Sequence, residues 1–126
     1  MIFEVTPIRD KERLESLYTS SGLPLPAFPF GMDMRAGEDA GYALFEIDHD
    51  AACISLLYAQ APDPALLDAT IRSGFAAGEQ MGCQHVDLGV GMPADMEARL
   101  LPLGYTRGHK SMDDFFGQCP SSQQGI

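Results

Sequence analysis

The chain has 126 residues, of which 45% are hydrophobic and 21% charged, and its formal net charge is −10. This length suits one domain with a real hydrophobic core, and the composition is that of a soluble globular protein. The acidic balance argues against nucleic acid as a partner, because phosphate binding needs clustered Lys and Arg. No apolar run approaches the roughly 20 residues of a membrane helix, so no membrane partner is expected.

The N-terminal residues and the cysteines bear on the cellular compartment. Met1–Glu4 lacks the basic start and apolar core of a secretory signal, so a cytoplasmic location is expected. The cysteines are odd in number and widely spaced, which predicts free thiols and neither a disulfide frame nor a zinc site; they are Cys53, Cys83 and Cys119. The acidic charge either keeps the protein soluble or favours a cationic amine or a basic protein surface as partner.

The chain begins with a predicted strand and a predicted helix. Ile2–Val5 is short and rich in β-prone residues, as expected of a first strand. Asp10–Ser20 follows with apolar residues at helical spacing and charged residues between them. The residues expected to face inward are Leu14, Leu17 and Tyr18.

A proline-rich stretch over Ser20–Pro29 comes next and excludes a continuous helix. It runs into Phe28, Phe30, Met32 and Met34, which alternate with other residues. This segment is either an edge strand or an apolar flap. A flap would close over a substrate, whereas an ordinary loop would cover the hydrophobic core. The role of covering the core is favoured. A polar turn is expected over Gly37–Gly41.

A hairpin is predicted in the middle of the chain. Tyr42–Ile47 reads as one strand, Asp48–Asp50 as the turn, and Ala51–Gln60 as the returning strand. The returning strand is apolar along almost its whole length, which is typical of a central strand that is buried on both faces.

Helix, strand and helix are then predicted from Asp63 onward. Asp63 is a suitable N-cap, and Pro64 suits the first helical position. An apolar stripe at helical spacing follows, ending at Gly82: Leu66, Leu67, Ile71, Gly74, Phe75, Gly78 and Met81. His85–Val90 alternates as a strand does. Gly91-Met92-Pro93 opens a second helix that directs Met96 and Leu100 inward and is stopped by Pro102 and Gly104.

The chain is expected to close with a turn, a last strand and a tail. Thr106–Lys110 is the predicted turn and Ser111–Phe116 the predicted final strand. Residues 117–126 are polar, rich in Ser and Gln, and predicted to form a flexible C-terminal tail.

Leu103-Gly104-Tyr105 and the segment Lys110–Phe116, coming after helix, strand and helix, resemble the C-terminal half of the GNAT family, the Gcn5-related N-acetyltransferases. The resemblance implies a single α/β domain over residues 1–116, with a mixed central sheet flanked by helices. It also implies transfer of an acetyl group from acetyl-CoA to an amine of a small molecule or of a protein. The signature is short and is stronger on fold than on activity.

The resemblance further implies where acetyl-CoA would lie. The cofactor would enter the splay between the strands Ala52–Ala59 and His85–Val90, where backbone groups of Leu57, Tyr58 and Ala59 would grip the pantetheine. In the diphosphate loop, Gln60 matches the first position of the family pattern and Ala65 the last.

That loop also departs from the family, because the glycines between its ends are missing. Pro62 and Pro64 each remove an N–H donor, and Asp63 places a carboxylate where a diphosphate would sit. Three explanations stay open: CoA is held differently, the loop has lost its ligand, or the resemblance is purely architectural.

Two residues are the catalytic candidates that the resemblance implies. Glu46 is the best-placed carboxylate on the middle strands for a general base, and Tyr58, where the central strand ends, is the candidate acid. For each there is a plainer interpretation: Glu46 as a solvated strand residue and Tyr58 as core packing. Tyr105 belongs to the Gly-Tyr signature and is expected to pack.

Other motifs are weaker. His85 and Asp87 share one face of a predicted strand, as in the start of a metal site or an acid–base pair. No third ligand can be placed from the sequence, so no metal is expected. No P-loop, dinucleotide fingerprint or Gly-x-Ser-x-Gly motif is present.

Two further functions remain alternatives to the transferase. One is a catalytically inactive GNAT-fold domain whose acidic surface binds a basic protein partner. The other is an unrelated α+β domain that binds a small apolar ligand under the segment Phe28–Met34. A homodimer also remains possible under each of these interpretations.

Overall fold

A computed structural model describes residues 2–88 and 92–117 of the chain. These residues form one six-stranded sheet with the order β1-β2-β3-β4-β5-β6. Strands and helices follow in the order β1 (Glu4–Pro7), α1 (Lys11–Ser20), β2 (Pro29–Ala36), β3 (Asp39–Asp48), β4 (Cys53–Gln60), α2 (Pro64–Gln80), β5 (His85–Asp87), α3 (Ala94–Leu100), the 3-10 turn η1 (Leu101–Leu103), β6 (His109–Ser111) and α4 (Met112–Gly117).

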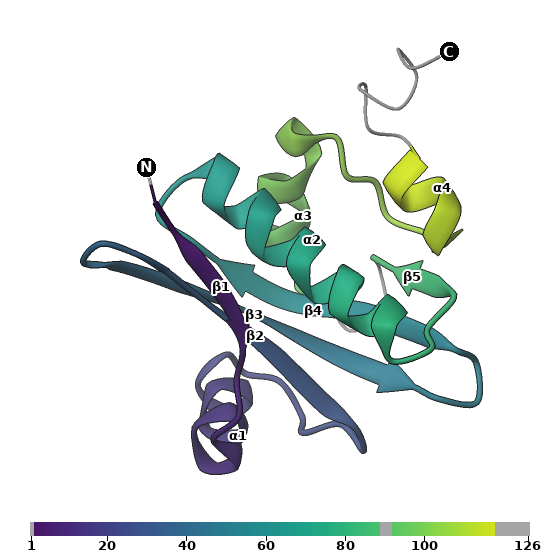
Figure 1. Cartoon of the computed structure of the whole chain (residues 1–126), viewed down its shortest axis with the longest axis horizontal. Helices are drawn as coiled ribbons and strands as arrows, with labels where there is room; N and C mark the ends of the chain where they lie inside the picture. Colours follow the sequence, from purple (N-terminus) through teal and green to yellow (C-terminus); the bar gives the residue numbers. More distant parts are fainter. Residues whose placement is uncertain (1, 89–91, 118–126) are drawn as a thin grey trace.

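The sheet is mixed, which confirms the predicted α/β class. β1 to β4 are antiparallel neighbours, β4 and β5 are parallel, and β5 and β6 are antiparallel. Helix α2 makes the crossover that a parallel pair requires. In Figure 1, α1 lies on one face of the sheet, and α2, α3 and α4 lie on the other. Among the described residues, no helix has the length and apolar character needed to span a bilayer.

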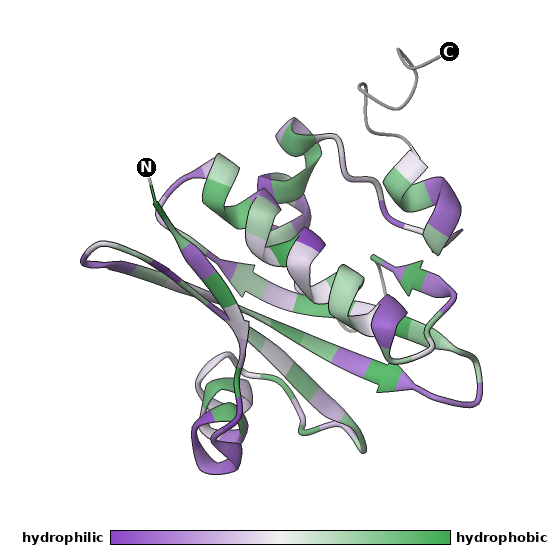
Figure 2. Ribbon diagram, viewed as in Figure 1, coloured by the Kyte–Doolittle hydropathy of each residue, from purple (hydrophilic) through white to green (hydrophobic). Residues whose placement is uncertain are grey.

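Each face of the sheet carries its own apolar cluster. On the face covered by α1, the cluster contains Leu14, Tyr18, Leu44 and Leu57. The larger cluster, on the face covered by α2, joins residues of the sheet to residues of α2, α3 and α4. The hydropathy colouring in Figure 2 shows α1 as largely hydrophilic, with apolar positions on the side toward the sheet. Helices α1 and α2 therefore bury one stripe each, as their spacing predicts, except that Met81 at the end of the predicted α2 stripe is 46% exposed.

Helix α2 lies unusually close to the sheet because two glycines face it. A Cβ atom added at Gly74 would come 2.1 Å from the ring of Phe45, and one at Gly78 would come 2.9 Å from Ile54. The N-terminus of α2 is capped as predicted, with Asp63 Oδ1 accepting from the N–H of Leu66 at 2.9 Å. The glycines in the predicted stripe thus mark the contact surface of the helix.

The segment Phe28–Met34 is neither a flap nor an edge strand, contrary to the interpretations drawn from its sequence. From Pro29 onward it belongs to β2, which pairs with β1 on one side and β3 on the other. Pro29 is tolerated because it stands at the first position of the strand. Met32 and Met34 are 3% and 1% exposed, so the alternation marks an interior strand.

The first strand and the polar turn are also displaced from their predicted positions. The strand was expected over Ile2–Val5 but spans Glu4–Pro7, because Glu4 is the first residue to pair with β2. Pro7 is accepted there because β1 is an edge strand. The turn over Gly37–Gly41 is shorter than expected, since β3 already begins at Asp39.

The predicted final strand Ser111–Phe116 is wrong: β6 ends at Ser111 and α4 follows. The N–H of Asp114 donates to the Ser111 hydroxyl oxygen at 3.1 Å, which is an N-cap interaction. Met112 and Phe115 are both buried, and their spacing of three is that of a helix. Gly117, assigned to the tail, is the last residue of α4; residues 118–126 of the predicted tail lie outside the described part.

The remaining C-terminal predictions are confirmed in part. Strand β5 is limited to His85–Asp87, and Val90 of the predicted strand lies outside the described residues. The second helix is present as α3, with Met96 and Leu100 buried. Gly104 has φ +90° and is therefore the left-handed cap that its sequence position predicts.

Candidate functional site

The candidate site begins where β4 and β5 separate. Their parallel pairing covers Cys53–Ser55 and His85–Asp87. Beyond Ser55, β4 continues to Gln60 with no described strand beside it on that side. Five residues of an interior strand therefore have one edge that is unpaired within residues 2–88 and 92–117, and such an edge can accept an extended ligand.

A β-bulge stands at the same place. Leu44 is opposite Tyr58 and Phe45 is opposite Leu56, so β4 has one additional residue, Leu57, between the two pairs. A bulge leaves the extra residue outside the regular ladder and bends its strand. The side chain of Leu57 is buried in the cluster under α1, which leaves its backbone as the group available to a ligand.

Tyr58 lies at the open edge of β4. Its ring is 6.0 Å from the ring of Tyr42, and its hydroxyl donates to Oε1 of Gln60 at 3.2 Å. The guanidinium carbon of Arg99, on α3, is 5.5 Å from the centre of the Tyr58 ring. Tyr58 thus connects β4 to α3 across the separation and is not sealed in the core, whereas Ala59 beside it is fully buried.

Glu46 is placed on β3 by pairing with Pro29 on one side and Ser55 on the other. It is half-buried on the face covered by α1, and its charge contributes, after burial, to the raised pKa of Tyr18. Tyr58 pairs with Leu44, two positions before Glu46, but its ring packs against the larger cluster and lies beside Arg99 of α3, so the two candidates are not confined to one face. Among the described residues, no hydrogen bond joins Glu46 to Tyr58 directly.

Glu46 also borders a hollow of about 540 Å³ at the end of the β3–β4 hairpin. Asp48 and Asp50 line it with Phe28, whose ring meets the edge of the His49 imidazole at 4.6 Å. No Lys or Arg belongs to this lining. We call it the acidic hollow.

A second hollow, of about 220 Å³, lies where α2 begins and faces the α3–η1 segment. Its walls are mostly apolar and include Pro62, Pro64, Leu67, Pro102 and Leu103. Asp63 and Arg99 are the charged residues of the lining. We call it the proline hollow. In the layout implied by the resemblance, this is the place of the diphosphate loop that runs from Gln60 to Ala65.

The residues at the proline hollow do not fit a diphosphate. Two of the loop residues are prolines, which lack N–H groups. The N–H of Leu66 is already bound to Asp63, whose negative charge would repel a phosphate. The unpaired edge of β4, in contrast, fits a thioester arm, since such an arm is extended and carries amide groups that pair with a strand. The described residues therefore suit an extended arm of such a cofactor but not its diphosphate.

His85 and Asp87 do share a neighbourhood, and the structure adds His109 to it. The two imidazole rings stack at 4.9 Å, and Nδ1 of His109 is 3.8 Å from Oδ2 of Asp87. His109 falls in the predicted turn Thr106–Lys110 but is the first residue of β6, where it pairs with Asp87 and its side chain stays exposed. Within the described part of the chain, no group of three or more ligand side chains is suited to a metal ion.

Two of the three cysteines can be located. Cys53 and Cys83 are free and buried, and burial raises the pKa of both thiols above the ordinary value. A buried thiol with a raised pKa is a poor nucleophile at neutral pH, so neither belongs to the candidate chemistry. Cys119 lies outside the described residues.

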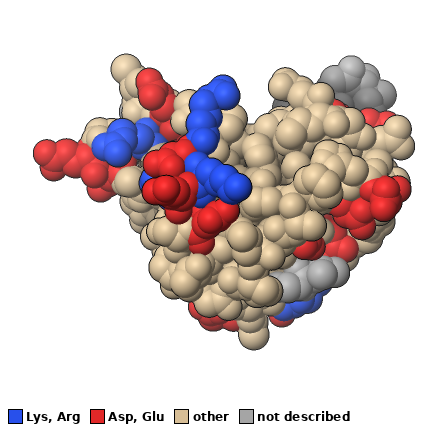
Figure 3. All heavy atoms as spheres, turned by 90° about the horizontal axis from the view of Figure 1, so that it is seen from below, with Lys and Arg blue, Asp and Glu red and all other residues tan. Residues whose placement is uncertain are grey.

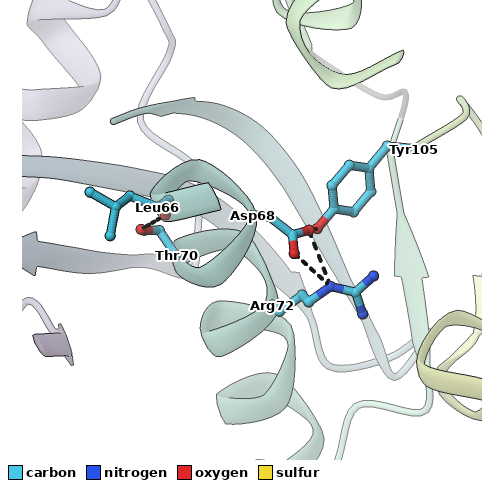
Figure 4. A network of polar contacts seen from close by, with 5 residues as sticks. All are labelled: Leu66, Asp68, Thr70, Arg72 and Tyr105. Atoms are coloured by element: carbon cyan, nitrogen blue, oxygen red, sulfur yellow. Dashed lines mark hydrogen bonds and ion pairs between the residues drawn. The ribbon is translucent and has the colours of Figure 1, made fainter. Parts of the chain in front are cut away.

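A polar network that the sequence did not indicate joins Tyr105 to α2 (Figure 4). The Tyr105 hydroxyl donates to Oδ1 of Asp68 at 2.5 Å, and Arg72 Nε binds the same carboxylate at 3.1 Å. Burial and the bond to Asp68 raise the pKa of Tyr105 well above its usual range. The partners are 37 positions apart, so no local pattern could have revealed the bond. It anchors the Gly-Tyr segment to α2.

Comparisons with protein-family models, with curated proteins and with solved structures found no match. The open edge of β4, the acidic hollow and the proline hollow are the features that a proposed function has to use.

Proposed function

We propose that this chain is a GNAT-type domain that acts as an acetyl-CoA-dependent N-acetyltransferase-like protein on an amine. The observation that carries the proposal is the open edge of β4 beyond Ser55, with its bulge at Leu57 beside the departing strand β5. The order of strands and helices from β1 to α3 supports the proposal, whereas most of the expected last strand is the helix α4.

The thioester arm would lie along β4 as an added strand. Backbone groups from Leu57 to Ala59 would bond to the amides of the pantetheine, which supplies binding energy without a specialised side chain. The bulge at Leu57 interrupts the regular ladder with β3 beside this edge and would bend β4 where the arm lies.

Glu46, on the face covered by α1, and Tyr58, at the open edge of β4, would handle the protons. Glu46 accepts a proton from the incoming ammonium group through water, and the amine nitrogen then attacks the thioester carbon. The new C–N bond forms as the C–S bond breaks, the Tyr58 hydroxyl gives a proton to the departing thiolate, and the Tyr58 oxygen then takes the second proton from the new amide nitrogen. The acidic hollow beside Glu46 would attract the cationic amine.

Isothermal titration tests the proposal with two ligands, acetyl-CoA and S-acetyl-pantetheine, which lacks the diphosphate. Because two prolines and the Asp63 carboxylate make the loop a poor site for a diphosphate, we expect saturable binding of S-acetyl-pantetheine as well as of acetyl-CoA. Sodium pyrophosphate should not compete with either ligand. Absence of binding of both thioesters at millimolar concentration would remove the transferase from consideration.

A second function, an inactive acidic interaction module, is favoured by one observation: the Asp63 carboxylate occupies the N-terminus of α2. The partner would be a basic protein surface. Seen from below the sheet, acidic side chains stand out on the right of the view, whereas acidic and basic ones mix on the left (Figure 3). The acidic hollow, with Glu46, Asp48 and Asp50, would receive Lys or Arg side chains.

Binding of a lysine-rich peptide to the immobilised protein distinguishes this second function. The double variant Asp48→Asn/Asp50→Asn should weaken capture, while Asn keeps the ability to cap the hairpin turn that Asp48 caps now. The control is Asp113→Asn/Asp114→Asn, which removes the same charge from α4. Equal loss in both variants would indicate unspecific attraction to the net charge and would reject a docking site at the hollow.

A further inference from the structure

The proline hollow has a lining that suits a ligand different from the diphosphate of a CoA loop. Its volume of about 220 Å³ exceeds the ~150 Å³ that is enough for an apolar cavity to hold benzene. Proline and leucine side chains supply most of the walls. An apolar hollow of this size favours a flat ring of one or two cycles over a charged group.

The cation in the lining is arranged for contact with a ring. Arg99 already lies over the ring of Tyr58 at 5.5 Å, and Oδ2 of Asp95 is 3.8 Å from its Nη2. A guanidinium group so placed attracts the electron-rich face of an aromatic ring. The Asp95 carboxylate, four residues before Arg99, offsets its charge and reduces attraction for a free anion.

The anion in the lining is arranged to accept a hydrogen bond. Oδ1 of Asp63 receives the N–H of Leu66, whereas Oδ2 receives no hydrogen bond from the described residues. An ionised carboxylate oxygen binds an N–H donor strongly and excludes a phosphate. Arg99 and Asp63 thus place a cation and an acceptor around one apolar hollow.

We infer that the proline hollow binds a flat heteroaromatic ring bearing an N–H group, with the ring face toward Arg99 and the N–H toward Asp63. Two sources share this chemistry: the adenine at the nucleotide end of acetyl-CoA, and a separate small heteroaromatic molecule. The inference stands on the hollow alone and does not depend on acetyl transfer.

Indole, 1-methylindole, adenosine and pyrophosphate are the probes, used in titrations of ¹⁵N-labelled full chain followed by amide chemical shifts. We expect saturable shifts at Leu67 and Leu103 with indole or adenosine. 1-Methylindole should bind roughly three- to tenfold more weakly than indole, because it lacks one hydrogen bond. Pyrophosphate should cause no saturable shift at these residues. Failure of both indole and adenosine, or saturation by pyrophosphate, would overturn the inference.

Competition between acetyl-CoA and indole then identifies the source of the ring. Displacement of indole by acetyl-CoA and not by S-acetyl-pantetheine assigns the hollow to adenine. Indole that stays bound beside acetyl-CoA assigns it to a separate molecule. S-Acetyl-pantetheine has no ring, so its binding tests the strand edge alone and separates failure of this inference from failure of the proposed function.

Variants supply a second, independent check. Arg99→Gln should weaken indole binding by roughly threefold, as expected for loss of one partly exposed cation–π contact. Arg13→Gln is the matched control: Arg13 is similarly exposed and paired with a carboxylate, but lies on α1. Equal affinities of the wild type, Arg99→Gln and Arg13→Gln for indole would contradict the placement of the ring beside Arg99. The comparison of indole with 1-methylindole uses the wild-type protein. It therefore still tests the inference if a variant fails to fold.

Discussion

Tyr18 shows how much of this fold depends on single buried polar groups. Its side chain is fully buried, and its hydroxyl accepts the N–H of Phe30 at 3.1 Å and bonds to the carbonyl oxygen of Phe45. One phenol on α1 therefore ties together β2 and β3. Burial raises the pKa of Tyr18 to about 12.

Tyr18→Phe should lower the free energy of unfolding at pH 7 by roughly 1–3 kcal/mol, because it leaves buried backbone groups without a partner. Chemical denaturation measures the change. Leu17→Ala, one position away on the same helix, is a useful comparison because it removes apolar contact without removing a hydrogen bond.

The same tyrosine predicts a pH dependence. The folded protein holds the phenol proton more tightly than the unfolded chain, in which tyrosine titrates near 10. Its stabilisation is therefore complete below pH 10 and is lost as the pH rises through 12, by roughly 2–3 kcal/mol. Between pH 9 and 12, the free energy of unfolding should decline less steeply for Tyr18→Phe than for the wild type. Equal slopes would contradict the assignment of this pH dependence to Tyr18.

Tyr58 and Glu46 carry the prediction for catalysis. If the proposed transfer occurs, Tyr58→Phe should reduce kcat by roughly 10²–10⁴-fold, the usual worth of a positioned acid, with the Kd for S-acetyl-pantetheine unchanged. Glu46→Gln should reduce kcat most at low pH, where the amine acceptor needs a base. Mass spectrometry of the acetylated amine gives both rates, and loss of thioester binding in Tyr58→Phe would instead indicate a packing role.

At the level of single elements, helix α2 is positioned by its close packing against strands β3 and β4. Glycine in a helix interior normally costs about 1 kcal/mol relative to alanine, so Gly→Ala usually stabilises. At Gly74 the added Cβ would meet the Phe45 ring at 2.1 Å, a distance that side-chain movement in a packed core cannot relieve cheaply.

We therefore expect Gly74→Ala to lower the free energy of unfolding by roughly 1–3 kcal/mol despite its better helix propensity. Ser73→Ala, at the adjoining and less buried position, should raise the free energy of unfolding by a few tenths of a kcal/mol. Alanine is a better helix former than serine at such a position. Urea denaturation of both variants measures the contrast. A stabilised Gly74→Ala protein would show that α2 lies farther from the sheet.

For the molecule as a whole, the net charge of −10 sets an ionic-strength dependence. The chain has 8 Lys and Arg against 18 Asp and Glu, so most of the excess negative charge has no cationic partner and self-repulsion dominates the long-range electrostatics. Salt screens repulsion over a Debye length of about 10 Å at 0.1 M.

Raising KCl from 20 to 500 mM should accordingly increase Tm by a few degrees, measured by circular dichroism at pH 7. The same change should weaken capture of a lysine-rich peptide if the acidic surface binds one. A Tm that falls with salt would mean that local ion pairs outweigh the repulsion between like charges.

Local patterns were sufficient for the helices α1, α2 and α3 and for the strands β3 and β4. Each has its own signal within a few residues: an Asp or Pro at the start, an apolar stripe at the right period, or alternation bounded by a turn. The departure of the loop after Gln60 from a phosphate-binding pattern was also visible, because proline and aspartate act on the backbone next to them.

Tertiary structure alone decided the features that depend on distant partners. β2 is an interior strand because β1 and β3 pair with its two edges, and α4 is a helix because Met112 and Phe115 meet the core together. The separation of β4 from β5, the bond from Tyr105 to Asp68 and the proline hollow likewise join segments far apart in the chain. Sequence periodicity reports which side of an element is buried, whereas pairing and packing are set by the elements that meet it.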